Sequence, residues 1–366
     1  MSKKIFISAI EYSANIHALK LIQSLKDSNL DFEIFGIFDE KIINKKSQFS
    51  PNDFRIMGFS GIIKLIPKYF KIKNQLTNLA TKCDVAIFID SSSFNIPIIK
   101  NMQNKTNTKI IYYILPQVWA WKRYRAKLLS KLCDELWGII PFEKDYYPQD
   151  SNISYVGHPL LDEIPYSNTN KQNTNKIALM PGSRKGEIKN LFSIFKEVSQ
   201  KIPNKKFILI APKSFQNRDL NKIYGEIDNI EISFDPYTAL KECEFAFVCS
   251  GTATLETTLL GIPTILAYKT RVLDFLIARS LVKLKFVGLA NIFLSYKYHK
   301  SINNTNIQAP IHPEFLQFFD AQCLLDAYYN FDYDKFFKEK ESLISYLEHG
   351  SAKICTNKLQ NFYKNK

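Results

Sequence analysis

The chain has 366 residues, of which 46% are hydrophobic and 23% are charged, and its net charge is +14. This length predicts two domains, and the composition excludes disordered, collagen-like and mini-protein classes. The six cysteines form neither a CxxC pair nor a Cys/His cluster. We therefore predict no structural zinc, no disulfide framework and a reducing compartment.

The apolar stretch at the start of the chain ends at Glu11, which makes it too short for a signal peptide. No apolar run approaches the roughly 20 residues that a bilayer-spanning helix needs. We expect a protein that is not integral to a membrane, and association with a membrane surface stays open.

The positive charge is concentrated in one segment. Residues 54–132 hold fourteen Lys and Arg against Asp84 and Asp90, a net +12, whereas residues 1–53 are neutral and residues 133–366 are nearly so. A localised positive field indicates an anionic partner, which on charge alone is nucleic acid, a phosphorylated substrate or an acidic lipid surface.

Short apolar runs alternate with longer helical patterns in the first half of the chain, which is typical of parallel α/β units. The expected strands are Lys4–Ile10, Phe32–Ile37, Asp84–Asp90, Lys109–Leu115 and Glu135–Ile140, and the expected helices are Ile16–Lys26, Pro67–Thr81 and Arg123–Leu132. We predict an N-terminal Rossmann-like domain over residues 1–166.

A second series follows a polar stretch at residues 167–175, which reads as a linker. Its expected strands are Lys176–Met180, Lys206–Ala211, Glu231–Phe234, Phe245–Cys249 and Thr264–Tyr268, and its expected helices are Glu187–Ile202, Asn217–Tyr224, Tyr237–Cys243 and Ala253–Leu260. These predict a second Rossmann-like domain over residues 167–330, with residues 295–310 irregular. A C-terminal helical segment should occupy residues 331–366.

Two Rossmann-like domains predict a site in the cleft that they face, at the carboxyl ends of their strands. In the first domain, Asp90 ends an apolar strand and precedes the polar run Ser91–Asn95. A carboxylate there serves as a general base, a helix cap or a metal ligand. A metal is disfavoured, because no second acid or histidine lies nearby in sequence.

In the second domain, two loops between a strand and a helix suit phosphate groups. Gly182, Ser183 and Arg184 offer backbone N–H groups and a guanidinium, and Ser250, Gly251 and Thr252 stand at a helix N-terminus. Glu256 is placed to bind ribose hydroxyls or to complete a capping box. Together the loops predict a nucleoside diphosphate site, and the absence of GxGxxG argues against NAD.

The chain resembles the lipid-A-disaccharide synthases, which are inverting glycosyltransferases of the GT-B fold. The resemblance covers about residues 5–320. Its motifs are ISAIEYSANIHA (7–18), FIDSSSFNIP (88–97), QVWAWKRYR (117–125), IIPFEKDYY (139–147), VGHPLLDEIP (156–165), LMPGSRKGEI (179–188), SGTATLETTLLGIP (250–263), LAN (289–291) and HPEFLQ (312–317).

The resemblance implies a reaction in lipid A (lipopolysaccharide) biosynthesis. UDP-2,3-diacylglucosamine would donate its sugar to 2,3-diacylglucosamine 1-phosphate, giving the β-1,6 disaccharide 1-phosphate and UDP without metal or other cofactor. Asp90 would be the base, and Arg184 with Ser250–Thr252 would stabilise the leaving diphosphate. Asn291 would contact the nucleotide. Glu11, Ser13, Asn95 and His158 are candidates for the cleft or the acceptor, and His158 is catalytic or structural.

Two departures from the family pattern bear on the base. The family's SGD reads Ser13–Asn15 here, and a second Asp of the family is Ser93 in this chain. Fewer acids remain near the expected site, so Asp90 becomes the clearer candidate. The family's LPN reads 289–291 with Asn291 retained.

The segment at residues 57–76 combines apolar side chains with lysines, the pattern of a helix that lies in a bilayer interface. Core packing is the common alternative for such a helix. Because both implied substrates carry acyl chains, we expect peripheral attachment to the anionic cytoplasmic face of the inner membrane. The residues expected to make it are Ile62, Ile63, Lys64, Leu65 and Lys68.

Two alternatives remain for function. Another UDP-sugar GT-B enzyme, such as an epimerase or a peptidoglycan glycosyltransferase, shares the fold. A basic nucleic-acid-binding protein would explain the charge, but no RRM, KH or helix-turn-helix signature accompanies it, so no nucleic-acid partner is expected. A monomer and a homodimer with exchanged C-terminal segments both stay open.

Overall fold

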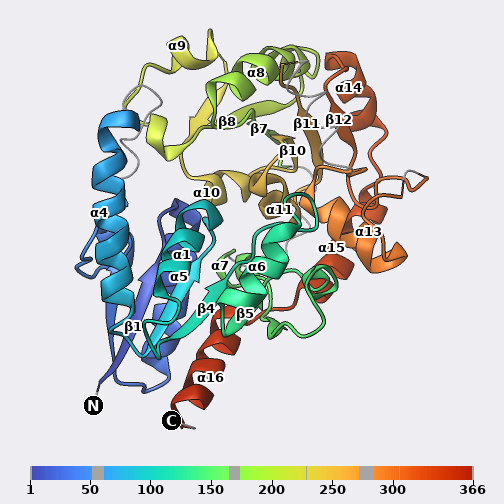
Figure 1. Ribbon diagram of the computed structural model, residues 1–366. Coiled ribbons are helices and arrows are strands. Elements are labelled where there is room, and N and C mark those ends of the chain that lie inside the picture. Colours follow the sequence, from blue (N-terminus) through green and yellow to red (C-terminus); the bar gives the residue numbers. More distant parts are fainter. Residues whose placement is uncertain are drawn as a thin grey trace. The chain divides into compact units, whose positions relative to one another are not determined.

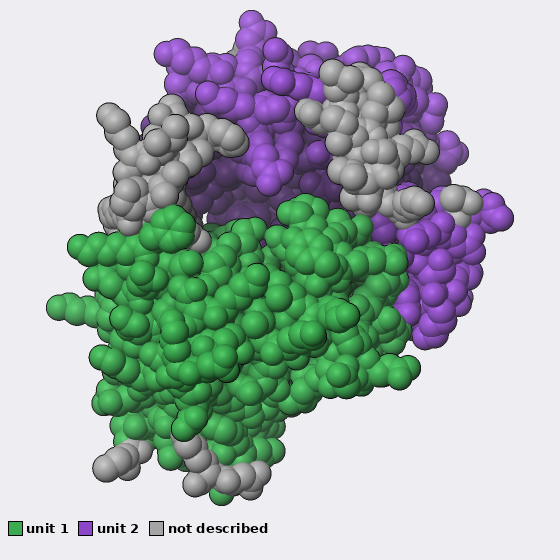
Figure 2. Space-filling model, viewed as in Figure 1, with its two compact units in different colours: residues 1–163, 347–366 green, residues 164–346 purple. Residues whose placement is uncertain are grey.

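The computed structural model describes residues 2–51, 62–164, 174–227, 229–271, 284–304 and 306–364, without the side chains of residues 62–69 (Figure 1). The chain forms two compact units. Unit 1 comprises residues 1–163 and 347–366, and unit 2 comprises residues 164–346 (Figure 2). The expected domain boundary at residues 166 and 167 lies outside the described residues. The expected C-terminal segment is divided between the two units.

Unit 1 contains a six-stranded parallel sheet in the order β2-β1-β3-β4-β5-β6. Its strands are β1 (Lys3–Ser8), β2 (Phe32–Ile37), β3 (Val85–Ile89), β4 (Lys109–Tyr113), β5 (Glu135–Gly138) and β6 (Ile153–Tyr155). Its helices are α1 (Tyr12–Asp27), α2 (Glu40–Ile43), α4 (Ile62–Ala80), α5 (Ser92–Met102), α6 (Tyr124–Leu132), α7 (Pro159–Glu163) and α16 (Ser351–Lys364), with the 3₁₀ turn η1 (Glu143–Tyr146).

All five strands expected in this half of the chain are present, and the expected Rossmann-like organisation is confirmed. The prediction missed strand β6, helix α5 and three short elements, α2, α7 and η1. Strand β6 has only three residues, too few to show a periodic pattern. Helix α5 begins in a serine run and contains Pro97, both of which lower its helical propensity.

The sheet of unit 1 changes direction of growth at β1. This strand pairs with β2 through Phe6 and Phe35 and with β3 through Phe6 and Ala86, so α1 and the later crossovers leave from opposite sides of it. In parallel α/β sheets, ligands bind outside the carboxyl ends of strands at such a switch point. The loops after β1 and β3 therefore form the edge of unit 1 where a ligand is expected to bind.

Unit 2 contains a second six-stranded parallel sheet, in the order β12-β11-β10-β7-β8-β9. Its strands are β7 (Lys176–Met180), β8 (Lys206–Ile210), β9 (Glu231–Ser233), β10 (Phe245–Cys249), β11 (Thr264–Tyr268) and β12 (Glu314–Leu316). Its helices are α8 (Lys185–Gln200), α9 (Leu220–Tyr224), α10 (Pro236–Leu240), α11 (Thr252–Leu259), α13 (Leu289–His299), α14 (Ala321–Tyr329) and α15 (Tyr333–Leu347), with the 3₁₀ turn η2 (Lys213–Phe215).

The switch point of unit 2 lies between β7 and β10, which pair directly through Leu179 and Phe247. The two loops expected to bind phosphate follow these two strands. One expectation in this unit is wrong: residues 295–299 are not irregular, because α13 extends through them with its side chains from Ala290 to Tyr296 buried. The burial of that helix supplies the stability that its polar sequence did not indicate.

Alternate residues of each central strand pack on opposite faces of the sheet, as the pleat requires. In β1, Ile5 and Ile7 join the cluster that includes Leu21 of α1 and Leu359 of α16. Phe6 joins the opposite cluster with Leu76 of α4 and Ile98 of α5. The continuous apolar runs of the strands thus follow from helices on both faces.

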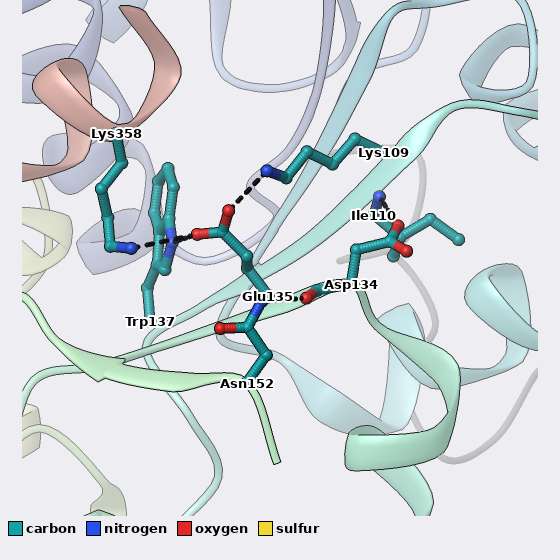
Figure 3. A network of polar contacts seen from close by, with 7 residues as sticks. All are labelled: Lys109, Ile110, Asp134, Glu135, Trp137, Asn152 and Lys358. Carbon is teal, nitrogen blue, oxygen red and sulfur yellow. Dashed lines mark hydrogen bonds and ion pairs between the residues drawn. The ribbon is translucent and has the colours of Figure 1, made fainter. Parts of the chain in front are cut away.

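Helix α16 returns from the end of the chain to pack on unit 1, and a polar network fixes its position (Figure 3). Glu135 Oε2 accepts hydrogen bonds from Lys358 Nζ at 3.2 Å and from Trp137 Nε1 at 2.8 Å. Lys109 Nζ contacts Glu135 Oε1 at 2.5 Å. Although burial opposes it, these partners lower the pKa of Glu135. The C-terminal helix is therefore a part of the N-terminal fold in this chain.

Candidate active site

The backbone at the end of β3 holds Asp90 in an uncommon conformation. Asp90 and Ser91 have φ angles of 49° and 41°, in the left-handed region that costs a non-glycine residue about 1–2 kcal/mol. The Asp90 N–H donates to the carbonyl of Tyr113 at 2.9 Å, and the Asp90 carbonyl accepts from Tyr112 Oη at 2.5 Å. Neighbouring strand β4 thus fixes the turn that carries the carboxylate.

Asn95 completes the support of this turn. Its Nδ2 donates to the carbonyls of Asp90 at 2.8 Å and Ile89 at 3.2 Å, and its Oδ1 accepts from Ser8 Oγ at 2.7 Å. Asn95 is fully buried. Asn95 thus joins β1 to the turn after β3 and holds the backbone of Asp90, and acceptor contact by Asn95 stays a prediction.

The loop after β1 lies beside Asp90. Ser91 Oγ donates to Glu11 Oε1 at 3.3 Å, and both Glu11 and Ser13 are exposed at the start of α1. Burial raises the pKa of Asp90, the Ser91 N–H opposes that rise, the charge of Glu11 adds to it and His17 opposes it. A carboxylate with a raised pKa is a stronger base than an exposed one, which suits proton abstraction from a hydroxyl.

His158 is placed by its backbone as part of the scaffold. Its N–H donates to the carbonyl of Leu347 at 3.0 Å, which ties the segment before α7 to the chain that leads into α16. Burial lowers the pKa of His158 to about 3, so the ring is neutral. Nearby, His17 Nδ1 contacts Glu163 Oε1, which joins α1 to α7. These contacts favour the structural alternative for His158.

In unit 2, the loop after β7 is shaped by Glu187, a residue not predicted to act there. Its Oε2 accepts the N–H groups of Ser183 and Arg184, both at 3.1 Å, and its Oε1 contacts Arg184 Nη1 at 3.0 Å. Gly182 has a φ of 102°, and a Cβ at this position would lie 2.6 Å from Glu187 Oε2. The glycine is needed both for its conformation and for space.

This arrangement changes the expected use of the loop. The N–H groups of Ser183 and Arg184 are occupied by Glu187 instead of pointing at a free phosphate site. The side chain of Arg184 is 83% exposed, and a guanidinium has five N–H donors. The guanidinium is therefore the group of this loop that can bind an anion.

The loop after β10 presents the N-terminus of α11. Gly251 and Thr252 are exposed there, and Gly251 has a φ of 156°. The Ser250 N–H donates to the carbonyl of Ala267 at 3.1 Å and holds the loop to β11. Because first-turn N–H groups lack intrahelical acceptors, this end favours an anion. Glu256 is partly exposed, about one turn into the helix.

Asn291 is fully buried, and its amide is used within unit 2. Its Nδ2 donates to the carbonyl of His312 at 2.9 Å and to Glu314 Oε1 at 2.7 Å, and its Oδ1 accepts from the Ile311 N–H at 3.0 Å. Glu314 also accepts from the N–H of Gly288 at 3.1 Å. Burial raises the pKa of Glu314 to about 7 despite these bonds. Nucleotide contact by Asn291 stays a prediction.

A third buried carboxyl group follows β5. Glu143 Oε2 accepts from the N–H groups of Ile139 at 2.9 Å and Ile140 at 3.1 Å. Burial raises the pKa of Glu143 to about 8 against the effect of these bonds. Glu143 and Glu187 share a local sequence signal, since each acid follows the two amides that it binds by three and four residues.

The described residues contain no group of three His, Cys, Asp or Glu side chains arranged to hold a metal ion. The six cysteines are free thiols.

Comparison with known proteins identifies the family. A family model described as lipid-A-disaccharide synthetase matches residues 5–354. The lipid-A-disaccharide synthase of Helicobacter pylori (strain ATCC 700392 / 26695) is 43% identical over 366 residues, covering 97% of each chain. That of Campylobacter jejuni is 40% identical over 370 residues, covering 96% of this chain and 97% of its own.

The chain belongs to the lipid-A-disaccharide synthase family.

The family assignment confirms the resemblance drawn from the motifs, and with it a glycosyltransferase of lipid A biosynthesis. Solved structures agree on the fold. A UDP-GlcNAc 2-epimerase from Neisseria meningitidis, bound to UDP-GlcNAc, covers 98% of this chain and 99% of its own with a TM-score of 0.60 at 12% identity. MurG from Acinetobacter baumannii covers 98% and 99% with a TM-score of 0.59 at 12% identity. The two-unit GT-B fold is thereby established.

The described helices include none with the length and apolar character needed to cross a bilayer. Of the residues proposed for membrane contact, Ile62, Ile63, Lys64, Leu65 and Lys68 begin helix α4, but their side chains lie outside the described residues.

The Glu143 carboxyl generates a prediction for stability. Because its pKa is about 8 in the folded protein and 4.5 in the reference state, the folded form binds the proton more tightly between these values. Between pH 5 and 8, this group should therefore lower the free energy of unfolding as the pH rises, by up to about 1.4 kcal/mol per pH unit, while the lowered pKa of His158 acts in the opposite direction. Glu143→Gln should remove this contribution.

Urea unfolding followed by tryptophan fluorescence measures it in unit 1, since all three tryptophans, Trp119, Trp121 and Trp137, belong to that unit. Glu33→Gln, at an exposed position of β2, is the control and should leave the pH profile of wild type. Parallel profiles for wild type and Glu143→Gln would contradict the prediction.

Proposed function

We propose that this protein transfers 2,3-diacylglucosamine from its UDP derivative to the 6-hydroxyl of 2,3-diacylglucosamine 1-phosphate. The products are the β-1,6 lipid A disaccharide 1-phosphate and UDP. The observation that carries the proposal is the turn after β3, which holds the Asp90 carboxylate at the switch point of a parallel sheet and raises its pKa. The family membership supplies the substrate class.

In the proposed step, the acceptor 6-oxygen attacks the anomeric carbon of the donor as the bond from that carbon to the diphosphate oxygen breaks. The hydroxyl proton passes to an Asp90 carboxylate oxygen, and attack from the face opposite UDP inverts the anomeric centre. The hydrogen bonds from Asn95 and Tyr112 to the Asp90 backbone prevent the turn from relaxing.

The leaving diphosphate gains negative charge during this step. We assign its stabilisation to the guanidinium of Arg184 and to the N-terminus of α11 at Gly251 and Thr252, groups that act electrostatically without a metal. We propose that Glu256 binds the ribose and that Asn291 contacts the nucleotide. Gly182, Ser183 and Ser250 give the two loops their shape.

Attachment to the membrane is proposed through the first turns of α4. That helix starts at Ile62, and the adjoining part of it exposes Phe70 and Lys71. Apolar side chains that enter the interface and lysines that meet anionic headgroups both strengthen such binding. The protein would then work at the cytoplasmic face of the inner membrane, where diacylated substrates reside.

A transfer assay with purified protein and both diacylated substrates tests the reaction. Wild type should release UDP and form the disaccharide phosphate, whereas Asp90→Asn should lower kcat at least a hundredfold because its amide accepts no proton at neutral pH. Isothermal titration should show nearly unchanged UDP binding by the variant. Epimerised donor in place of disaccharide would favour the epimerase alternative, and a fully active Asp90→Asn would remove Asp90 as base.

Arg184→Ala should weaken UDP binding about tenfold to a hundredfold, the loss typical of a charge-assisted hydrogen bond. Titration calorimetry with UDP alone measures this without turnover. Lys189→Ala, an exposed position further along α8, is the matched control and should bind UDP as wild type does. Equal affinities for Arg184→Ala and wild type would refute the phosphate role.

Co-sedimentation with vesicles containing anionic lipid tests the membrane proposal. Replacing Ile62, Ile63 and Leu65 by Ser together with Lys64 and Lys68 by Glu should reduce the bound fraction severalfold. The control is Lys127→Glu with Lys131→Glu, two exposed positions of α6, which changes the net charge by the same amount as the α4 variant. Equal losses in both variants would show that general charge, and not α4, holds the protein to the vesicle.

A further inference from the structure

A cationic cluster beside the Asp90 turn has no part in the function proposed so far. It consists of Trp121, Lys122 and Arg123, which precede α6, and of Arg125, the second residue of that helix. Trp121 is 49% exposed, with Lys122 Nζ 4.2 Å and the Arg125 guanidinium carbon 5.8 Å from its ring centroid. These contacts hold the two cations on one aromatic side chain.

Arg125 connects this cluster to the catalytic turn. Its Nη1 donates to Ser92 Oγ at 2.6 Å. Ser92 is the first residue of α5 and follows Asp90 by two positions, so the Cα atoms of Ser92 and Asp90 are at most about 7.6 Å apart. The guanidinium is therefore held near the proposed base by a hydrogen bond, which a freely moving surface arginine would lack.

The charge of the cluster is not neutralised within the described part of the chain. None of the ion pairs there includes Lys122, Arg123 or Arg125, and Ser92 accepts the one hydrogen bond that the Arg125 guanidinium donates to a described residue. A guanidinium has five N–H donors, so four remain for a ligand. Planar, paired donors of this kind suit phosphate oxygens, which they bind bidentately.

We propose that Arg125, supported by Lys122 and Arg123, binds the phosphate monoester of the acceptor and positions the acceptor hydroxyl on Asp90. This proposal rests on the proposed function. In an aminohexose 1-phosphate, the carbons that carry the phosphate and the 6-hydroxymethyl group both flank the ring oxygen. A base for the 6-hydroxyl and a cation for the 1-phosphate must therefore lie on one edge of one sugar ring.

The contact between Arg125 and Ser92 meets this requirement from within unit 1. Ser92 is nearly buried and cannot follow a moving side chain, so it fixes where the guanidinium meets the phosphate. The same contact would distinguish a phosphorylated acceptor from one without phosphate. An acceptor without phosphate would leave the cationic cluster unpaired, and it would lose the contact that turns its 6-hydroxyl toward Asp90.

Transfer kinetics with two acceptors, the diacylglucosamine 1-phosphate and the same lipid without phosphate, test the proposal in detergent micelles at saturating donor. Arg125→Ala should raise the KM for the phosphorylated acceptor about tenfold to a hundredfold, while the KM for the donor stays within about twofold of wild type. With the unphosphorylated acceptor, wild type and Arg125→Ala should be equally poor. Arg125→Lys should lie between them, because it keeps the charge and loses the paired donors.

Lys127→Ala, an exposed cation two residues further along α6, is the control and should match wild type on both acceptors. Vesicle binding by Arg125→Ala should also equal that of wild type, which separates the acceptor phosphate from phosphate groups of membrane lipids. If the tryptophan fluorescence of Arg125→Ala shows that unit 1 is not folded, Arg125→Lys is compared with wild type on the two acceptors in its place.

Three results would overturn the assignment while leaving the proposed function intact: an unchanged KM, an equal loss on both acceptors, or reduced vesicle binding that accounts for the loss. A wild-type protein that forms no disaccharide from the phosphorylated acceptor would instead refute the proposed function.

Discussion

Both units depend on one constraint, which is that backbone polar groups at the carboxyl end of a parallel strand lose their ladder partners and need others. In this protein, side chains that follow the strand supply them. Asn95 binds the carbonyls of Ile89 and Asp90, Glu187 binds the N–H groups of Ser183 and Arg184, and Glu143 binds those after β5. Hydrogen bonds with the chain's own side chains therefore hold these loops.

Supporting a loop with a buried side chain costs desolvation energy when that side chain is charged, and two kinds of supporting group limit this cost. Asn95 supports the Asp90 turn with an uncharged amide, so within the described residues the backbone of the proposed base is not bonded to a second buried acid. Elsewhere the supporting group is a carboxyl, and burial raises the pKa of Glu143 and Glu314 toward neutrality. A protonated or partly protonated buried carboxyl avoids most of the desolvation penalty of a charge.

The positive charge is unevenly distributed along the chain, and its distribution agrees with the ligands proposed for the two units. The excess of positive charge lies in residues 54–132 of unit 1, where the cluster around Trp121 meets the Asp90 turn, while the residues from 133 onward are nearly neutral. In the proposed diphosphate site of unit 2, a helix N-terminus and one guanidinium supply the local positive charge. The proposed acceptor is a lipid phosphate at an anionic surface, and a wide positive field would draw a protein to such a surface.

The sequence by itself determined the two parallel α/β units, the positions of ten strands and the family, because these follow from local apolar runs and from contiguous motifs. Only the tertiary structure decided what the polar residues do. Asn95 and Asn291 looked like ligand contacts, yet each binds atoms distant in sequence, as when Ser8 meets Asn95 across 87 positions. Likewise, the sequence does not distinguish Arg125 from the other thirteen cations of residues 54–132, whereas the structure shows its hydrogen bond to Ser92. Strand order sets such pairings, and it depends on non-local packing that no local pattern encodes.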